Sequence, residues 1–303
     1  MQQDKKRFDI YEHVTNTIIA LLEKGTIPWR KPWRETGLPR NLITGHVYTG
    51  INHLLLNCLP YEEQYYLTWK QIQSSAGSVL PGEKGHFVVF RKTIEVEDKI
   101  DRTKKEKHHL LRYYHVFNVA QCKDIPLRLI QKSDIVKRIK NPIEECEWVI
   151  EDYKTCPQIM HTDARAYYSP MHDYINVPDI GLFTTSEGYY TTLFHEIIHS
   201  TGHTSRLNRK EVMERPHFGD ELYSIEELVA EIGACYLNSL VGIPNETIVN
   251  SAAYIQNWLT VLQNDKKFII QASTRAQRAV DFILNVERSI HDHDTLSAEQ
   301  VRV

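Results

Sequence analysis

The segment TTLFHEIIHSTGH at residues 191–203 carries the strongest structural signal in this 303-residue chain. His195 and His199 are four residues apart, so on a helix both imidazoles lie on one side, about one turn apart, and can bind one metal ion. Glu196 lies between them and can take a proton from a water molecule that such a metal acidifies. The pattern is typical of zinc peptidases. It predicts His195 and His199 as ligands and Glu196 as the general base.

The flanking residues favour a helix that is held against a core. Gly202 is expected to end this helix with a positive φ. Hydroxyl side chains suited to cap its start precede it at Thr184, Thr185 and Ser186. Three apolar side chains supply a face that would keep the helix in place: Phe194, Ile197 and Ile198.

A third ligand is expected from a second helix, predicted over residues 225–240. Its segment SIEELVAEIGACYL places three glutamates among apolar residues, and Glu227 and Glu231 share one face. We predict that Glu227 binds the metal and that Glu231, one turn further on, supports a ligand histidine from behind. The opposite assignment stays open. His203 is a third alternative, ranked lower because Gly202 should break the helix before it.

Charge divides the chain into two unlike parts. Residues 1–140 contain 24 Lys and Arg against 15 Asp and Glu, a net charge of +9. The remainder has 12 against 24, a net charge of −12, and the two together give the −3 of the whole chain. A basic part suits contact with a polyanion, although two soluble domains with different isoelectric points would give the same pattern.

The basic part interleaves aromatic and cationic residues, as a binding site for single-stranded nucleic acid does. The segment WRKPWR at residues 29–34 combines two tryptophans with three cations, and bases stack on such rings while cations contact phosphates. Packing of Trp29 and Trp33 as a plug against the first helix is the alternative. The predicted contacts to single-stranded DNA are Trp29, Arg30, Lys31, Trp33, Arg34, Arg40, Asn41, Tyr48, Asn52, Trp69, Lys70 and Lys84.

Several classes of protein and site are excluded. No apolar run reaches the roughly 18 residues of a membrane-spanning helix. The N-terminus has no apolar signal core, so we expect a cytoplasmic protein without membrane contact. The five cysteines have no CxxC spacing, which argues against a disulfide framework or a zinc knuckle. The chain has no GxxxxGK[ST] phosphate loop, so no nucleotide cofactor is expected.

Periodicity predicts a chain of mixed α+β structure. The charged run Glu95–His109 is expected to form an exposed hairpin loop, and a domain boundary is expected between about Asp124 and Pro142, where the charge changes sign. Strands are expected around 88–90 and within 159–177. Helices are expected over residues 8–24, 68–75, 143–154, 225–240, 246–264 and 268–288.

Taken together, these motifs resemble the ArdC antirestriction family. The similarity to its zincin-like metallopeptidase domain lies in YYTTLFHEIIHSTGHTSRLNR, which starts at Tyr189, and FGDELYSIEELVAEIGACYL, which starts at Phe218. The similarity to its N-terminal domain lies in YEHVTNTIIALLEKGTIPWRKPW, PRNLITGHVYTGIN, LTWKQIQ, GEKG and HVFNVAQ. The chain departs from the family pattern at Ser200, where Trp is common.

The resemblance implies an N-terminal α+β single-stranded DNA-binding domain at residues 1–130. A mostly helical, zincin-like metallopeptidase domain would follow at residues 143–290. It further implies a protein of plasmids or other mobile elements that protects incoming single-stranded DNA from host restriction. We expect Zn²⁺ at the metal site, with Mn²⁺ as the alternative, and a protein or peptide substrate that the sequence does not identify.

Two other functions fit parts of the sequence. A DNA-shielding protein with a purely structural metal site would keep the same ligands and need no proteolysis. A metal-dependent nuclease is less well supported, because nuclease sites favour clusters of carboxylates over His-Glu-x-x-His. For a peptidase, the side chain that stabilises the oxyanion would come from four candidates: Tyr168, His203, His217 and Tyr223.

Overall fold

The computed structural model describes residues 8–29, 38–97, 105–126, 141–213, 221–244 and 252–287.

The first helix begins and ends at the residues that its sequence signals indicate. Helix α1 (Ile10–Glu23) begins where the carboxylate of Asp9 accepts hydrogen bonds from the backbone N–H groups of Tyr11 and Glu12. It is followed by Gly25, whose φ of +76° is a conformation that glycine adopts without strain. The helix predicted over residues 8–24 is confirmed.

A four-stranded sheet forms the base of the N-terminal part. Strand β1 (Arg40–Asn41) pairs in parallel with β2 (Tyr65–Thr68). Strand β2 is antiparallel to β5 (Lys105–Asn118), which is antiparallel to β4 (His86–Glu97). The predicted strand at residues 88–90 therefore lies near the start of the longer β4, where Val88 and Val89 are buried.

Smaller elements complete the N-terminal part. Helix α2 (Ile51–Asn57) lies against β4, and α3 (Trp69–Ser74) follows β2 directly. A capping box at Thr68 starts α3 and confirms the short helix predicted there. After β5 the chain forms the short 3₁₀ helix η1 (Val119–Gln121) and then strand β6 (Cys122–Lys123). Strand β6 pairs with the earlier β3 (Ser78–Val79) in a two-stranded antiparallel sheet.

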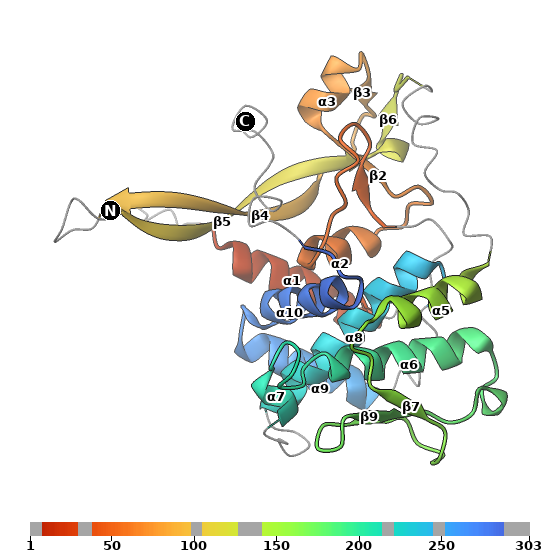
Figure 1. Ribbon diagram of the computed structural model, residues 1–303. Coiled ribbons are helices and arrows are strands. Elements are labelled where there is room, and N and C mark those ends of the chain that lie inside the picture. Colours follow the sequence, from red (N-terminus) through yellow and green to blue (C-terminus); the bar gives the residue numbers. More distant parts are fainter. Residues whose placement is uncertain are drawn as a thin grey trace.

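Strands β4 and β5 form a long hairpin that reaches out from the body of the molecule (Figure 1). Its register runs from His86 opposite Val116 to Glu97 opposite Lys105. The prediction that Glu95–His109 is a loop is therefore wrong at both ends of that run. Charged residues continue the strands because the ladder is made by backbone hydrogen bonds, which need no apolar side chains. Residues 98–104 lie outside the described ranges.

The C-terminal part begins with α5 (Pro142–Asp152) and a three-stranded sheet. Strand β7 (Gln158–Met160) pairs in parallel with β9 (Tyr174–Asn176), and β8 (Tyr167–Ser169) is antiparallel to β9. The predicted strand pair within residues 159–177 is thus a sheet of three short strands.

Helices form the rest of the C-terminal part. The long α8 lies at its centre, packed against α6 and α10 (Figure 1). The helices predicted over residues 143–154, 225–240 and 268–288 are confirmed with shifted ends, and the one predicted over residues 246–264 is confirmed in its described part, residues 252–264. The elements after β9 are η2 (Ile180–Leu182), α6 (Ser186–Ser200), α7 (Lys210–Met213), α8 (Glu221–Val241), α9 (Ala252–Asn264) and α10 (Phe268–Ile283).

One hydrophobic core runs through both parts of the chain. Helix α1 packs on α9, and α2 packs on α10. Val14 and Leu54 from the N-terminal part belong to the same cluster of buried side chains as Leu228 and Ile269. The two segments predicted as domains therefore share apolar surface.

Polar contacts join the two parts at the N-terminus of α2. The N–H of Gly50 donates to the side-chain oxygen of Gln277 (3.0 Å), and its carbonyl oxygen accepts from the hydroxyl of Tyr236 (2.5 Å). The predicted mixed α+β fold is confirmed. Among the helices in the described ranges, none has the length and apolar character needed to cross a bilayer.

Candidate metal centre

Helix α6 holds the His-Glu-x-x-His residues in a fixed setting. The hydroxyl of Thr185 accepts a hydrogen bond from the N–H of Gly188 (3.1 Å), so Thr185 is the N-cap among the three predicted candidates. The predicted apolar face is buried completely, at Phe194, Ile197 and Ile198. Because that face is fixed in the core, the histidines on the other side of α6 have defined directions.

The end of α6 corrects the expectation for Gly202, which does not have a positive φ. A Cβ at this position would lie 2.4 Å from Cγ2 of Val212 and 3.1 Å from Cζ of Arg209. Glycine is needed here because α7 and the Arg209 side chain come close to the backbone. The chain thus folds back over the end of α6 and brings Arg209 beside the helix.

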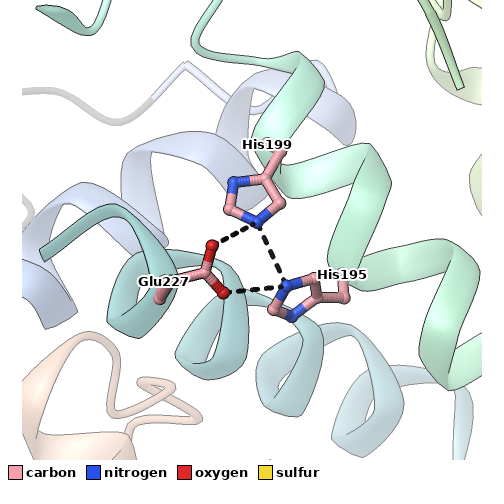
Figure 2. A group of neighbouring side chains, drawn as sticks. All are labelled: His195, His199 and Glu227. Atoms are coloured by element: carbon pink, nitrogen blue, oxygen red, sulfur yellow. Dashed lines mark hydrogen bonds and ion pairs between the residues drawn. The ribbon is translucent and has the colours of Figure 1, made fainter. Parts of the chain in front are cut away.

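Three side chains converge on one point beside α6 and α8 (Figure 2). The Nε2 atoms of His195 and His199 are 3.1 Å apart. The two carboxylate oxygens of Glu227 divide between these nitrogens, with Oε2 at 3.6 Å from Nε2 of His195 and Oε1 at 3.6 Å from Nε2 of His199. Two imidazole nitrogens and one carboxylate oxygen are the donor set of many catalytic zinc sites. These residues therefore fit a divalent metal ion.

The second nitrogen of His199 is held from behind by Glu226. Its Nδ1 lies 3.1 Å from Oε1 of Glu226, and because a carboxylate only accepts, Nδ1 carries the proton. This tautomer directs the lone pair of Nε2 toward the point where the three side chains converge. A carboxylate behind a ligand histidine is the usual support of a metal site.

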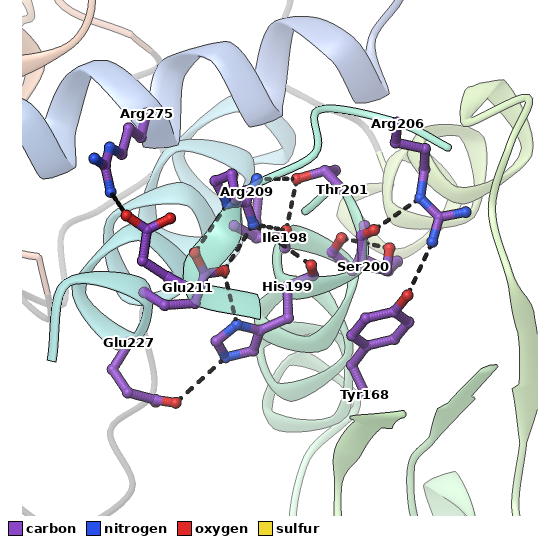
Figure 3. Close-up of polar contacts among 12 residues, drawn as sticks. Tyr168, Ile198, His199, Ser200, Thr201, Arg206, Arg209, Glu211, Glu227 and Arg275 are labelled. Atoms are coloured by element: carbon purple, nitrogen blue, oxygen red, sulfur yellow. Dashed lines mark hydrogen bonds and ion pairs between the residues drawn. The ribbon is translucent and has the colours of Figure 1, made fainter. Parts of the chain in front are cut away.

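Arg209 fixes Glu226 in turn. Its guanidinium binds both carboxylate oxygens, through Nε (2.9 Å) and Nη2 (2.7 Å), and both residues are buried. The same group donates to the carbonyl oxygen of Ile198 (2.8 Å) and the hydroxyl of Thr201 (2.6 Å) (Figure 3). Burial acts to raise the pKa of Glu226, but the charge of Arg209 and the bonds from His199 and Arg209 lower it.

The carboxylates around the two imidazoles favour a cation. Burial acts to lower the pKa of His195, yet Glu227, Glu196 and Glu231 raise it to about 9. Burial also acts to lower the pKa of His199, but its bond with Glu226 and the charges of Glu227 and Glu226 together raise it. Positive charge between the two rings is therefore stabilised, whether a proton or a metal ion supplies it.

The other two candidate ligands lie elsewhere. Oε1 of Glu231 accepts from the hydroxyl of Tyr254 (3.2 Å), and Nδ1 of His203 accepts from the N–H of Ser205 (3.2 Å). Neither belongs to the cluster of possible ligands in the described part of the chain. The residue behind His199 is Glu226 and not Glu231.

Glu226 and Arg209 were not singled out from the sequence as supporting residues. A signal for Glu226 was present, since it stands among buried apolar positions of α8, where a lone carboxylate is costly. Its partner could not be named, because 17 residues separate Arg209 from Glu226 and the path between them is not evident from periodicity.

The candidate oxyanion donors are occupied by other contacts or lie outside the described side chains. The hydroxyl of Tyr168 donates to Oδ1 of Asp173 (2.7 Å) and accepts from Nη2 of Arg206 (3.0 Å). Arg206 also pairs with Asp173. It donates through Nε to the carbonyl oxygen of Ser200 (2.7 Å), as Figure 3 shows. This group ties the end of α6 to β8 and β9. The side chains of His217 and Tyr223 are not among those described.

Four of the predicted DNA contacts are buried or form hydrogen bonds within the protein. Trp29 is 1% exposed, and its Nε1 donates to the hydroxyl of Tyr254 (3.1 Å). Asn41 and Tyr48 are also buried. The side chain of Asn52 accepts from the N–H of Val89 (2.8 Å) and donates to its carbonyl oxygen (2.6 Å). It thus pairs with the backbone of β4 as a neighbouring strand would. These aromatic and amide groups are engaged in internal packing and hydrogen bonds, which argues against their contact with a base.

Other predicted contacts stay accessible. Trp69 is 51% exposed, Lys70 and Lys84 are exposed, and Arg40 is half-buried. The ring of Phe117 lies 5.8 Å from that of Trp69 and packs against Gly85, so Trp69 and the residue Lys84 lie at the same end of the sheet. The remaining predicted contacts lie outside the described residues: Arg30, Lys31, Trp33 and Arg34.

The structure has a second exposed aromatic surface, on β4 and β5, that the sequence patterns did not predict. Phe87 and Tyr113 stack with ring centroids 4.7 Å apart, and Phe8 lies 5.0 Å from Tyr113. Phe8 is 51% exposed and Tyr113 is 39% exposed. Only the register of β4 and β5 brings Phe87 and Tyr113 together, so neither segment alone indicates the surface.

Two family models match the chain in succession. Residues 8–119 match the N-terminal domain of the anti-restriction factor ArdC. Residues 145–275 match a zincin-like metallopeptidase. The second match contains all three side chains of the candidate metal centre.

Curated relatives include proteins of very different length. The chain is 31% identical to the protein y4eC of Sinorhizobium fredii (strain NBRC 101917 / NGR234), with 91% of each chain covered. It is 32% and 33% identical to two proteins of Escherichia coli named DNA primase TraC, covering 98% and 94% of this chain. The matching region spans only 29% and 20% of those longer proteins.

Two crystal structures of the antirestriction protein ArdC from plasmid R388 share this fold at 36% identity. The metal-free form has a TM-score of 0.75 and covers 93% of this chain and 100% of that one. The Mn(II)-bound form has a TM-score of 0.72 and covers 95% and 100%. With both family models in succession and a relative matched along its whole length, the chain belongs to the ArdC antirestriction family.

Proposed function

We propose that this chain binds single-stranded DNA through its N-terminal part and hydrolyses peptide bonds at a zinc site in its C-terminal part. Its role would be to protect incoming mobile-element DNA from host restriction. The peptidase proposal rests on the convergence of His195, His199 and Glu227, with the buried Glu196 adjacent to His195 in α6. The membership in an antirestriction family supports the biological role.

Zn²⁺ is the ion that suits this donor set best, because two imidazoles and one carboxylate leave a fourth position for water or substrate. When bound, such an ion polarises a carbonyl group and lowers the pKa of a water molecule. Mn²⁺ is the alternative, since the similar R388 protein was solved with Mn(II).

Glu196 provides the acid–base chemistry in this proposal. Its carboxylate accepts a proton from the attacking water while the oxygen of that water bonds to the scissile carbonyl carbon. It then gives the proton to the amine nitrogen as the C–N bond breaks, so that an acid and an amine are released. Glu226 and Arg209 keep His199 in one orientation throughout, and Glu231 is the proposed support for His195.

The substitution Glu196→Gln tests this assignment. It should leave the metal content unchanged and lower the cleavage of a peptide library, followed by mass spectrometry, by at least about 100-fold. Glu187→Gln, in the first turn of the same helix, is the matched control and should keep full activity. Equal cleavage by Glu196→Gln and the control would exclude Glu196 as the base.

The same variant separates the peptidase from the DNA-shielding alternative. Transfer of a plasmid into a restricting host can be measured with and without the protein. If protection depends on proteolysis, Glu196→Gln should lose it. Protection that survives in full would favour shielding of the DNA with a metal site that is only structural.

Single-stranded DNA is the proposed nucleic acid partner of the N-terminal part. The net charge of +9 on residues 1–140 and the exposed ring of Trp69 beside Lys70 support this. The stacked Phe87 and Tyr113 offer a second exposed aromatic surface. Flat rings near cations are what unpaired bases bind, because every base has a face that can stack.

A further inference from the structure

A chain of hydrogen bonds leads from the N-terminal part of the protein to the metal centre. Nε1 of Trp29 donates to the hydroxyl oxygen of Tyr254 on α9 (3.1 Å). That hydroxyl donates to Oε1 of Glu231 on α8 (3.2 Å). Three segments far apart in the sequence are thus joined through polar atoms.

Trp29, the first donor in this series of hydrogen bonds, is held in one orientation. The side chain is 1% exposed, and its ring meets that of Trp258 edge-on, with centroids 5.9 Å apart and planes at 86°. A tryptophan held on all sides has one orientation for its N–H group. The hydroxyl of Tyr254 therefore receives a donor from a fixed direction, which leaves its own proton for Glu231.

Glu231 is the last acceptor in this series of hydrogen bonds and lies one helical turn from Glu227 of the metal centre. It follows Glu227 by one turn on the same face of α8, and α8 packs against α6, the helix that carries His195. A glutamate has three side-chain torsions, so without a partner its carboxylate would sample many positions. The donor on Oε1 restricts those positions.

We propose that Trp29 and Tyr254 are positioning residues of the metal centre, which hold Glu231 so that its carboxylate stabilises His195. The N-terminal part would then belong to the metal centre as well as to the DNA-binding surface. This inference rests on the proposed metal site. It assigns to His195 the kind of support that Glu226 and Arg209 give to His199.

Trp258 provides a matched comparison within the same cluster of rings. It is also a buried tryptophan, but its Nε1 has no hydrogen-bond partner among the described residues. Trp29→Phe and Trp258→Phe remove the same atoms from neighbouring sites. Only the first of these variants breaks the chain to Glu231.

The experiment measures the dissociation constants of Zn²⁺ and Mn²⁺ for the full chain, by competition with a chromophoric chelator. Tyr254→Phe and Trp29→Phe should each weaken metal binding by about 3- to 10-fold, less than the 10- to 100-fold typical of losing a supporting side chain itself. Trp258→Phe should bind like the unaltered protein. The Co²⁺ absorption spectrum should shift in the first two variants and not in the third.

A second arm separates positioning from packing. In the background of Glu231→Gln, Trp29→Phe and Tyr254→Phe should add no further loss of affinity, because the group that they position is already altered. Equal affinities of Trp29→Phe and Trp258→Phe, or full losses that persist beside Glu231→Gln, would overturn the inference. Failure of the unaltered protein to bind either metal would instead refute the metal site itself.

Discussion

His199 is contacted on both ring nitrogens by consecutive residues of α8. Glu226 lies 3.1 Å from Nδ1, and Glu227 lies 3.6 Å from Nε2. Consecutive residues of a helix point about 100° apart, so one carboxylate can be buried with Arg209 while its neighbour faces the ion. A pair of adjacent glutamates can therefore supply both a candidate ligand and the support behind a candidate ligand histidine.

The first prediction concerns the two histidines. His195→Ala or His199→Ala removes one of three donors, so bound metal should be lost on dialysis, as measured by elemental analysis. Affinity for a single-stranded oligonucleotide, measured by fluorescence anisotropy, should stay nearly unchanged, because Trp69 and Tyr113 lie on other elements. Metal binding at full strength by both variants would refute the site.

The second prediction ranks the three glutamates of α8. Glu227→Ala removes a direct bond to the ion and should lose the metal on dialysis. Glu226→Gln and Glu231→Ala alter groups behind the histidines and should retain a site weakened by about 10- to 100-fold, as titration with a competing chelator would show. If Glu231→Ala does more damage than Glu227→Ala, Glu231 is the ligand and our assignment is wrong.

Local spacing predicted three candidate ligands that do lie together in the structure, but it did not predict the residues that hold them. His195, His199 and Glu227 follow from helical periodicity on two segments. Trp29 shows the limit of this reasoning. Its neighbours in the sequence are cations, which favoured a DNA contact, whereas its neighbours in space are Tyr254 and Trp258 of α9. Such a contact depends on how distant helices pack.

At the scale of elements, the turn after α6 is pinned to the small sheet. Arg206 donates to the carbonyl oxygen of Ser200 at the end of α6 and pairs with Asp173 in the β8–β9 hairpin. Asp173 has a φ of +49°, which Asp and Asn tolerate better than other residues with a Cβ. This contact stabilises the turn that delivers Arg209 to Glu226.

The third prediction follows from the pKa of Asp173. Burial acts to raise it, but hydrogen bonds from Arg206 and Tyr168 lower it below the ordinary value of 3.8. A lowered pKa contributes stability that is present above the ordinary value and lost as the pH falls through the folded one. Asp173→Asn should therefore be less stable than the unaltered protein at neutral pH, and the gap should narrow between about pH 5 and pH 3.

Urea unfolding of the metal-free protein at several pH values would measure this gap. Asp163→Asn is the matched control, because Asp163 also pairs with an arginine, Arg165, but on the surface. Its effect should be smaller at every pH, since exposed pairs contribute little. A gap for Asp173→Asn that is constant with pH would contradict the assignment.

The elements themselves were largely predictable, and their exceptions have physical causes. Helix α1 is bounded by Asp9 and Gly25, whose cap and positive φ are local properties. Gly202 was assigned the same role as Gly25, yet it serves the close approach of Val212. The hairpin of β4 and β5 runs into charged sequence because backbone pairing alone extends it. Local signals predicted the ends of α1, whereas the role of Gly202 and the length of the hairpin depend on long-range contacts.

At the scale of the whole molecule, the two parts share a core although their charges differ. Residues 1–140 carry +9 and the remainder carries −12, while α1 and α2 pack on α9 and α10. An acidic part beside a basic one limits where a polyanion can lie, because the acidic surface repels phosphates. Bound DNA should therefore be confined to the N-terminal part, away from the carboxylates of the metal centre.

The last prediction tests how the N-terminal part binds DNA. Trp69→Ala removes an exposed ring and should weaken single-strand binding by about 1–3 kcal/mol, and Tyr113→Ala should do so if the surface on β4 and β5 is used as well. Both side chains are substantially exposed, so neither change should unfold the protein. Melting temperatures would confirm that the variants are folded before their affinities are compared.

The dependence of affinity on salt concentration distinguishes binding through cations and phosphates from nonspecific adsorption to apolar surface. Contacts between cations and phosphates release counterions, so the logarithm of the affinity should fall linearly with the logarithm of the salt concentration. Lys84→Ala should reduce the slope, because it removes one cation, whereas Trp69→Ala should lower the affinity at every salt concentration and leave the slope unchanged. Fluorescence anisotropy with a labelled oligonucleotide measures both quantities. Binding that ignores salt, or that prefers duplex DNA, would contradict a single-strand site built from exposed rings and cations.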